Sequence, residues 1–485
     1  MGSIERPAIE PLTCEFKVEF HKPEQLDRIK QATLDILETV GVRFPSTKAL
    51  DILDAGGCIV DRETEIVRFP RQVVLENMAK APRYFKMGAR DASCDIDLSD
   101  GRTYCTTDGC GTEIVDHATR ERRMSTKADV ALISRIADYL PAISFWWPTV
   151  SAGDCGETAQ LHEIDAGWNN SVKHLMGMVQ GERHAEYAVE MATVIAGGAD
   201  ELRANPVLSD LIGVISPLAQ DKDGIEAALV FAKAGVPVTF VTMPTLGTTA
   251  PATKAGAFAT GAAENVSGTV LLQMAYPGCP VAHSILQSYA DPRTGNFVSF
   301  PLDTRCRFLA TEVAHSWGVP NLAGFSSTDS ELPGTWQAAV EASQDMALFG
   351  FEGAELATGI GLTNVYTLFY PEHIMLDADI YSRGRYSLLD IDFSDEALAV
   401  DVVKKVGPGG HFLSTAHSRK HMRNATLKTI THEPDQDKPG HYRDPMEVAR
   451  EQADDLIANY QPVPLEAEKS AQLTSILASA DAELR

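Results

Sequence analysis

The stretch DGIEAALVFAKAGVPVTFV, residues 223–241, decides the fold class, because a helix pattern, a glycine and a short apolar run follow one another in it. Residues 223–234 have the period of a helix with one apolar face, and Gly235 is of the type that commonly ends a helix. Residues 237–241 are apolar and of strand length. A helix that leads directly into a strand is typical of α/β proteins.

The same order recurs on both sides of this stretch. A helix predicted at 182–196 ends at Gly197 and Gly198, and helices predicted at 304–317 and 335–349 end at Gly318 and Gly350. Together with apolar runs elsewhere, these units give seven candidate strands, and we expect an eighth either within 374–380 or in the N-terminal part. The seven candidates are residues 143–147, 173–178, 211–215, 237–241, 280–285, 321–325 and 355–359.

This repetition predicts an α/β fold built around a parallel sheet. A closed barrel and a doubly wound open sheet both fit the pattern. No GxGxxG or P-loop follows a candidate strand, which weakens the nucleotide-binding version of the open sheet. We predict three regions: an α+β N-terminal region over 1–124, the repeated units over 125–395, and C-terminal helices packed outside over 396–485.

Composition narrows the class of partner. The chain of 485 residues has 42 basic and 67 acidic side chains, for a net charge of −25, which disfavours nucleic acids and anionic membranes. No apolar targeting segment is evident at the start, and the long uncharged stretches are interrupted by Pro and Gly. The eight cysteines form no CxxC pair and fit reduced thiols. We therefore expect a cytoplasmic protein, and a homo-oligomer at this size.

Five segments together resemble one known family. Their order and spacing across roughly 20–465 resemble those of the trimethylamine methyltransferase family. The segments are ILETVGVR at 36–43, ALDILDAGGCIVD at 49–61, APRYF at 81–85 with GARD at 88–91, QMAYPGCPV at 273–281, and HFL at 411–413 with His417 and His421.

The resemblance implies a TIM-type (β/α)₈ barrel that moves a methyl group from an amine to the Co(I) corrinoid of a small partner protein. Founding members of the family carry pyrrolysine, whereas this chain has only standard residues. The branch without pyrrolysine includes enzymes for glycine betaine and related quaternary amines. Such a substrate leaves as a neutral tertiary amine and needs no general acid. The sequence assigns no catalytic residue, and we expect no metal bound directly by the chain.

A trimethylammonium group calls for aromatic faces, since it offers no ordinary hydrogen-bond donor. The aromatic candidates near expected strand ends are Trp146, Trp147, Trp336, Tyr366 and Tyr370. Successive strand residues point to opposite faces, so only one of the two adjacent tryptophans should face the lumen. Each aromatic could equally be an ordinary core residue.

Polar candidates complete the expected substrate site. His283 and His373 could bind the carboxylate of a betaine, although a core histidine with satisfied hydrogen bonds is an alternative for His283. Asp329, after the strand at 321–325, could hold a cation, contact the corrinoid or cap a turn. Uncharged loop residues suited to the close approach of a corrinoid are Thr242, Thr245, Gly247, Ser326 and Ser327.

Two other functions remain open from the sequence. One is a metal-dependent barrel lyase or aldolase with Asp, Glu and His ligands. The other is a betaine-binding protein without turnover.

Overall fold

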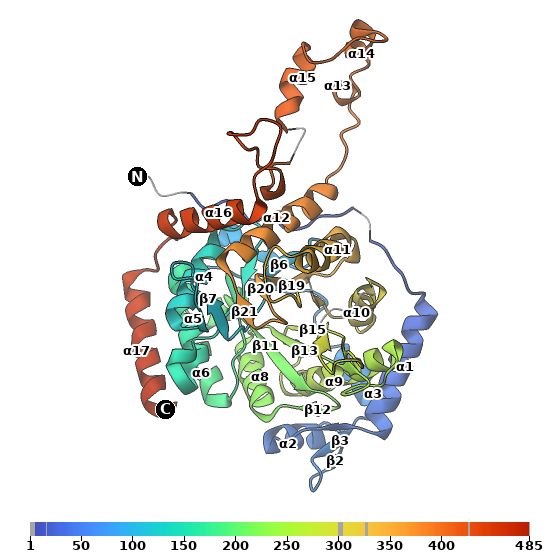
Figure 1. Cartoon of the computed structure of the whole chain (residues 1–485). Helices are drawn as coiled ribbons and strands as arrows, with labels where there is room; N and C mark the ends of the chain where they lie inside the picture. The colour runs from blue at the N-terminus through green and yellow to red at the C-terminus, as the bar shows by residue number, and fades with distance from the viewer. Residues whose placement is uncertain (1–4, 16, 299–303, 325–327, 425–426, 485) are drawn as a thin grey trace.

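A computed structural model describes residues 5–15, 17–298, 304–324, 328–424 and 427–484. Eight parallel strands lie at its centre, and Figure 1 shows helices surrounding them. The strands are β6 (Tyr104–Thr107), β9 (Phe145–Trp146), β10 (His174–Gly177), β11 (Leu208–Ile215), β13 (Val238–Thr242), β15 (Val281–Ile285), β18 (Leu322–Gly324) and β19 (Leu356–Ile360).

Each central strand is parallel to its neighbours. The pairs run from β6 through β9, β10, β11 and β13 to β15, and β19 pairs with both β18 and β6. One isolated parallel bridge, between His283 of β15 and Asn321, links β15 to the residue before β18. Together with this bridge, the strand pairs connect each of the eight strands to two neighbours. The predicted mixed α/β class is confirmed.

Helices precede or follow the central strands as the repeated pattern predicts. Thr126 and Asp129 form a reciprocal cap at the start of α4, and Gly235 ends α8 in the left-handed conformation. These helices are α4 (Lys127–Tyr139), α5 (Ala159–Asn170), α6 (Glu182–Ala196), α7 (Ala199–Ala204), α8 (Lys222–Ala234), α9 (Lys254–Ala275), α10 (Thr304–Ser316), α11 (Trp336–Glu352) and α12 (Pro371–Ser387).

The eighth strand is β6 of the N-terminal part, one of the two options left open by the sequence. The other option, 374–380, lies inside helix α12. Pro371 occupies the first turn of that helix, where its fixed φ is favourable, and Ile374, Met375 and Ala378 are buried at helical spacing. The boundary between the first two regions stays a prediction, although β6 precedes residue 124 and pairs within the central sheet.

The helices of the N-terminal segment pack against α9 and α10, outside the central strands. Its β1, β2 and β3 are antiparallel, and β1 also pairs in parallel with β12, which joins the segment to the central sheet. The elements are α1 (Pro23–Thr39), β1 (Val42–Arg43), α2 (Thr47–Ala55), β2 (Ile59–Asp61), β3 (Ile66–Arg68), α3 (Arg71–Met78), β4 (Lys86–Met87), η1 (Ala92–Cys94), β5 (Ile96–Asp97) and β12 (Ala219–Gln220).

Short strands and turns form the loops that follow the carboxyl ends of the central strands. Two small sheets combine segments that are far apart in the sequence, so the loops support one another. One contains β14 (Thr245–Leu246), β16 (Ser288–Ala290) and β17 (Phe297–Val298); the other contains β7 (Glu113–Val115), β8 (Arg122–Met124), β20 (Leu362–Thr363) and β21 (Leu368–Phe369), and η2 (Gly153–Thr158) lies before α5.

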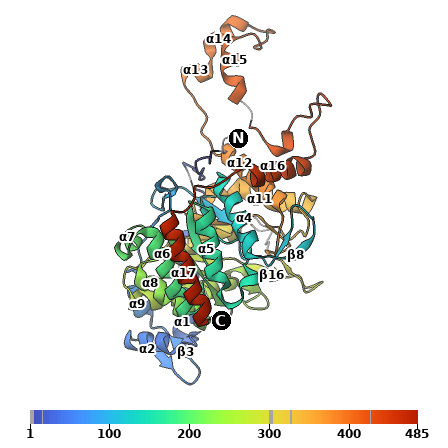
Figure 2. The ribbon, with the colours of Figure 1, turned by 90° about the vertical axis from the view of Figure 1, so that its left-hand side faces the viewer.

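The C-terminal part has two kinds of element. Helices α16 (Pro445–Asn459) and α17 (Ala467–Leu484) pack on the outside, α16 against α12 and α17 against α6. In contrast, α13 (Asp395–Leu398), α14 (Val400–Val406) and α15 (Ala416–His421) stand away from the body in Figures 1 and 2. The short turns η3 (Met422–Asn424) and η4 (Ile430–His432) lead back to the body.

The core has two layers because strand side chains alternate. Phe145, Met176, Leu211 and Val241 belong to a cluster inside the strands, whereas their chain neighbours belong to the larger cluster between strands and helices. This alternation determines which side chains can reach the lumen. Within the described ranges, no helix is both long and apolar enough to cross a membrane.

Candidate active site

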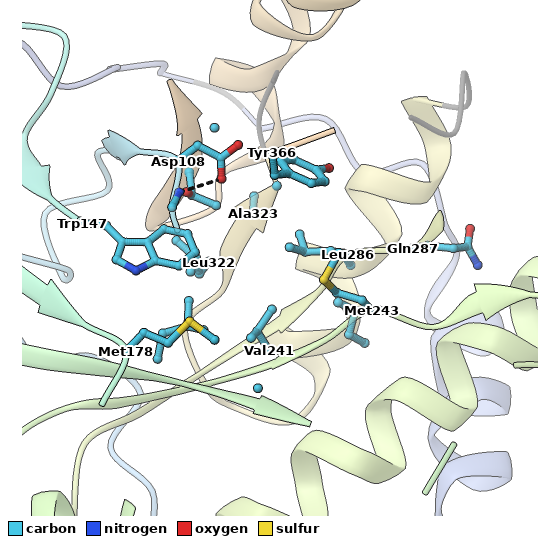
Figure 3. A pocket seen from close by; sticks show the side chains of 18 of the residues that line it. Asp108, Trp147, Met178, Val241, Met243, Leu286, Gln287, Leu322, Ala323 and Tyr366 are labelled. Carbon is cyan, nitrogen blue, oxygen red and sulfur yellow. Dashed lines mark hydrogen bonds between the residues drawn. The ribbon is translucent and has the colours of Figure 1, made fainter. Parts of the chain in front are cut away.

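A cavity of about 480 Å³ lies at the carboxyl ends of the central strands. Residues directly after β6, β9, β10, β13 and β15 contribute to its wall, because the carboxyl ends of parallel strands meet at one end. Figure 3 shows Trp147 and Asp108 on one side, with Leu286 and Met243 opposite.

Trp147 forms an aromatic wall of this cavity. It directly follows β9, and only 7% of its surface is exposed. The Thr107 hydroxyl donates to the Trp147 carbonyl at 2.6 Å, which holds the backbone. A Cβ atom added to Gly109 would lie 2.7 Å from the indole ring, so glycine at 109 permits the close packing of the loop after β6 against the ring.

Trp146 points the other way. A Cβ atom added to Gly167 of α5 would lie 2.3 Å from Cζ3 of Trp146, so the ring packs tightly on this helix. The expected alternation therefore places Trp147 in the lumen and Trp146 in the outer core.

Asp108 and Tyr366 lie on neighbouring parts of the wall. Asp108 follows β6, is 4% exposed, and its Oδ1 accepts a hydrogen bond from the Gly109 N–H at 3.0 Å. Tyr366 lies in a turn in which residues 364–366 all have positive φ, from 53° to 64°. Non-glycine residues adopt this conformation at a cost, and such positions concentrate at functional sites. The Asn364 N–H donates to the Ser330 carbonyl at 2.8 Å and anchors the turn.

Most of the remaining wall is apolar. Sulfur atoms are prominent in it: Sγ of Cys110 lies 3.9 Å from Sδ of Met178, and Met243 lies across the cavity. Burial raises the pKa of the Cys110 thiol well above its ordinary value, so the group is neutral near pH 7. The other apolar lining side chains include Leu211, Val214, Val241, Ile285, Leu286 and Leu322.

Two further charged residues line the cavity, Arg307 of α10 and Glu352 of α11. Nη1 of Arg307 donates to the carbonyl of Gly324, the last residue of β18, at 2.8 Å. In the order of neighbouring strands, β15 is four strands from β9, which is half of the eight. Arg307 lies on α10, between β15 and β18, and is therefore across the cavity from Trp147, which follows β9. Arg307 is the only Lys or Arg among the described lining residues.

Both predicted histidines lie outside the wall. Nε2 of His283 is 2.8 Å from the Thr269 hydroxyl of α9, and burial lowers the pKa of its imidazole to about 3. Nε2 of His373 is 3.3 Å from Asp377 Oδ2, and burial lowers its pKa to about 4. Both rings are neutral at pH 7, and His283 has the satisfied core position that we considered as the alternative.

Three other substrate candidates also lie away from the cavity. Trp336 begins α11 and is 84% exposed, whereas Tyr370 packs against Val115 and Leu368. The backbone N–H of Asp329 donates to Glu341 Oε2 at 3.0 Å, which ties its loop to α11.

Of the predicted corrinoid-facing loop residues, Thr242, Thr245 and Gly247 are described, and they do not line the cavity either. Thr242 is buried and hydrogen-bonds to Glu264 of α9, and Thr245 Oγ1 lies 2.8 Å from the Ser288 hydroxyl. Gly247, with φ of +78°, forms a turn. Ser326 and Ser327 lie outside the described residues. Among the predicted site residues that the structure describes, Trp147 and Tyr366 line the cavity.

Sequence reasoning missed Asp108, Cys110, Arg307 and Glu352. A signal for the first two was available, since the stretch DGCG at 108–111 follows the strand YCTT and combines a carboxylate with a glycine-rich turn. Arg307 and Glu352 lie within helices, where nothing in the sequence distinguishes them from surface charges.

Two comparisons of the sequence with known proteins give the same family. Residues 7–484 match the family described as trimethylamine methyltransferase (MTTB). The trimethylamine methyltransferase MttB of Desulfitobacterium hafniense strain DSM 10664 / DCB-2 is 30% identical over 95% of this chain and 93% of that protein. The glycine betaine methyltransferase of strain Y51 is 26% identical over 95% and 97%. The crystal structure of Methanosarcina barkeri monomethylamine methyltransferase aligns with a TM-score of 0.43 and 12% identity, covering 95% and 92%.

Proposed function

We propose, since this chain belongs to the trimethylamine methyltransferase family, that it demethylates a quaternary amine of the glycine betaine type. The methyl acceptor is Co(I) of a corrinoid carried by a partner protein. The premise is that the chain is a methyltransferase of this family and has only standard residues, as in the branch without pyrrolysine. The substrate and the acceptor are the proposal.

The observation that carries this proposal is the composition of the cavity wall. Trp147 and Tyr366 offer aromatic rings, Asp108 offers a carboxylate, and most other side chains are apolar. A trimethylammonium group is apolar on its surface and positively charged overall, so it fits a cavity that combines these properties. Its free energy of binding comes from contacts with the rings and from attraction to the carboxylate, which is stronger beside the buried Trp147 and Asp108 than in bulk water.

Arg307 supports a substrate with a second, negatively charged end. Its guanidinium lies across the cavity from Trp147, so a betaine could place its ammonium head at the ring and its carboxylate at Arg307. Hydrogen bonds between an arginine and a carboxylate are among the stronger ones in proteins. This arrangement would orient the N–CH₃ groups consistently within the cavity.

The chemistry then requires mainly positioning. The N–CH₃ bond breaks with its electron pair left on nitrogen, the methyl group passes to cobalt, and a neutral tertiary amine leaves. The corrinoid supplies the nucleophile. The cavity wall holds the substrate, excludes water and keeps one methyl group directed toward the mouth. No proton transfer is needed, so neutral groups such as the Cys110 thiol suit the wall.

The surroundings of the cavity support docking of an acceptor protein. Met243 lines the cavity and is also 38% exposed, so apolar surface extends outward. The eight central strands and the bridge from His283 to Asn321 support a TIM-type (β/α)₈ barrel, in which active sites lie at this end. We also propose that the enzyme acts in the cytoplasm, where reduced corrinoids and thiols persist.

Methyl transfer to chemically reduced cobalamin tests the proposal. The protein is mixed with cob(I)alamin and separately with glycine betaine, choline, tetramethylammonium or trimethylamine, and the spectral conversion of cobalt is followed. Conversion with a quaternary amine and none with trimethylamine is the expected result.

Three outcomes would contradict the proposal. Faster conversion with trimethylamine would reverse the substrate class. Tight betaine binding with no methyl transfer, even with a corrinoid protein present, would indicate a binding protein. Carbon–carbon cleavage that depends on an added divalent metal would indicate a lyase.

A further inference from the structure

Residues 390–423, here named the arm, leave the body after α12 and return toward η4. Figures 1 and 2 both show α13, α14 and α15 standing away from the rest of the molecule. No residue of the arm is buried. Hydrogen bonds and ion pairs join parts of the arm to one another, as between Nε2 of His421 and Glu396 Oε1 at 3.5 Å.

The base of the arm is fixed to the body. The Ile430 N–H donates to Asp379 Oδ1 of α12 at 2.8 Å, and Nη2 of Arg383 donates to the Thr429 hydroxyl at 2.8 Å. Ile430 itself is buried in the main core. The arm is therefore a projection anchored at both ends and not a loose chain terminus.

The arm exposes many large apolar side chains. Eight such side chains with roughly 100 Å² each would give about 800 Å², which is what one partner contributes to a stable interface of standard size. Exposed apolar area of this size is typical of a contact surface. The eight are Ile391 (73%), Phe393 (73%), Leu398 (54%), Val400 (55%), Val403 (52%), Phe412 (44%), Leu413 (81%) and Met422 (58%).

The helices of the arm also need a partner. They contain four, seven and six residues, and helices of such length are unstable in water without packing. A protein that docks only during turnover would leave these apolar side chains in water between encounters. A permanently bound protein would both stabilise the short helices and keep the apolar side chains out of water. Large apolar interfaces are typical of permanent assemblies.

Charge along the arm indicates what that neighbour is. All five acidic residues lie in its first half, 390–401, and all five basic residues lie in its second half, 404–423, whereas the rest of the chain carries the whole net charge of −25. A two-fold axis brings the same surface of two copies together. Within one arm, Glu396 already pairs with Lys420 and Asp401 pairs with Lys404. The axis can place the other acidic residues of one arm on the other basic residues of its partner; these are Asp390, Asp392 and Asp395, and Lys405, Arg419 and Arg423.

We propose that the arm is a self-association element, in which the arm of one copy packs on the arm of a second copy with acidic and basic halves facing. The apolar side chains supply the buried area, and the charges set the antiparallel register. Each chain carries both halves, so no other protein is required to cover them.

Sedimentation of the full-length protein tests the apolar part of the proposal. The variant Ile391→Ser/Phe393→Ser/Leu413→Ser is compared with Val40→Ser/Ile59→Ser/Leu75→Ser, which removes exposed apolar side chains from the N-terminal segment of the body. We expect a wild-type assembly with an even number of chains, a halved mass in the arm variant, and an unchanged mass in the control. Circular dichroism should show an unchanged body in all three proteins.

Charge reversal tests the register. One variant has a mainly acidic arm (Lys404→Glu/Lys405→Glu/Arg419→Glu), and the other has a mainly basic arm (Asp390→Lys/Asp392→Lys/Asp395→Lys). Each should fail to assemble alone, and mixing the two should restore the wild-type mass.

Several results would overturn the proposal. These are a monomeric wild type, an arm variant with the wild-type mass, or a mixture that does not assemble. Amide exchange in the arm that slows only when a corrinoid protein is added would assign the arm to that partner instead.

Discussion

Replacement of Trp147 by leucine should selectively weaken the binding of positively charged ligands. The indole is 7% exposed and lines the cavity, so an ammonium group at its face would be largely removed from water. A cation–π contact in such surroundings contributes about 2 kcal/mol. At 1.4 kcal/mol per factor of ten, the Kd for glycine betaine should rise about 30-fold.

A neutral ligand of the same shape separates charge attraction from packing. 3,3-Dimethylbutanoate has a carbon atom in place of the nitrogen of glycine betaine, so it keeps the ring contacts and loses the positive charge. Titration calorimetry of both ligands with both proteins gives the selectivity directly. The Kd for 3,3-dimethylbutanoate divided by the Kd for glycine betaine should be about 30-fold smaller in Trp147→Leu than in the wild type.

Trp146→Leu is the matched control. Its ring packs on Gly167 of α5 in the outer core, so its loss should lower the free energy of unfolding by about 2 kcal/mol or more and leave ligand selectivity unchanged. The reasoning is refuted if Trp147→Leu weakens both ligands equally, or if Trp146→Leu produces the same change in selectivity.

Three further predictions concern other parts of the chain. Arg307→Gln should raise the KM for glycine betaine about tenfold or more and leave choline nearly unchanged, because only the former has a carboxylate; equal effects in steady-state assays would remove Arg307 from the site. Gly167→Ala should lower Tm, since its Cβ would lie 2.3 Å from the Trp146 ring, whereas Gly213→Ala, with its nearest atom at 3.9 Å, should not, and calorimetry that ranks them in reverse would contradict the packing. Burial raises the pKa of Glu163 from 4.5 to about 7. The folded state therefore holds its proton more tightly, and this stabilising contribution is complete below pH 4.5 and lost as pH rises through 7. The Tm of Glu163→Gln minus that of the wild type should therefore increase between pH 5 and 8. A constant difference between the two curves of Tm against pH would contradict this.

The repeated units of the fold could be predicted because their signals are local. Gly235 ends α8 in the conformation that glycine favours, and the apolar run behind it forms β13. The strand β6 was harder to predict, since its sequence YCTT has no apolar run and differs from the other strands. Its place in the sheet depends on pairing with β9 and β19, which are remote in sequence.

The candidate site was only partly predictable, because strand register decides which side chains face the lumen. Alternation predicted that one of Trp146 and Trp147 would do so, but the choice depends on packing against Gly167. In β13, Val241 lines the cavity, so its neighbour Thr242 points outward to Glu264. Residue type alone favoured Thr242 as a corrinoid-facing residue, whereas its hydroxyl is buried against Glu264 of α9.

The most direct test of the central claim uses glycine betaine with deuterated methyl groups. The wild-type enzyme, a corrinoid protein in its Co(I) state and this substrate are mixed for a single turnover, and mass spectrometry follows the label. We predict one CD₃ group on the corrinoid for each molecule of deuterated dimethylglycine formed, with transfer much slower in Trp147→Leu than in Trp146→Leu. An unlabelled corrinoid, or equal rates in the two variants, would contradict the claim that the cavity at Trp147 delivers the methyl group.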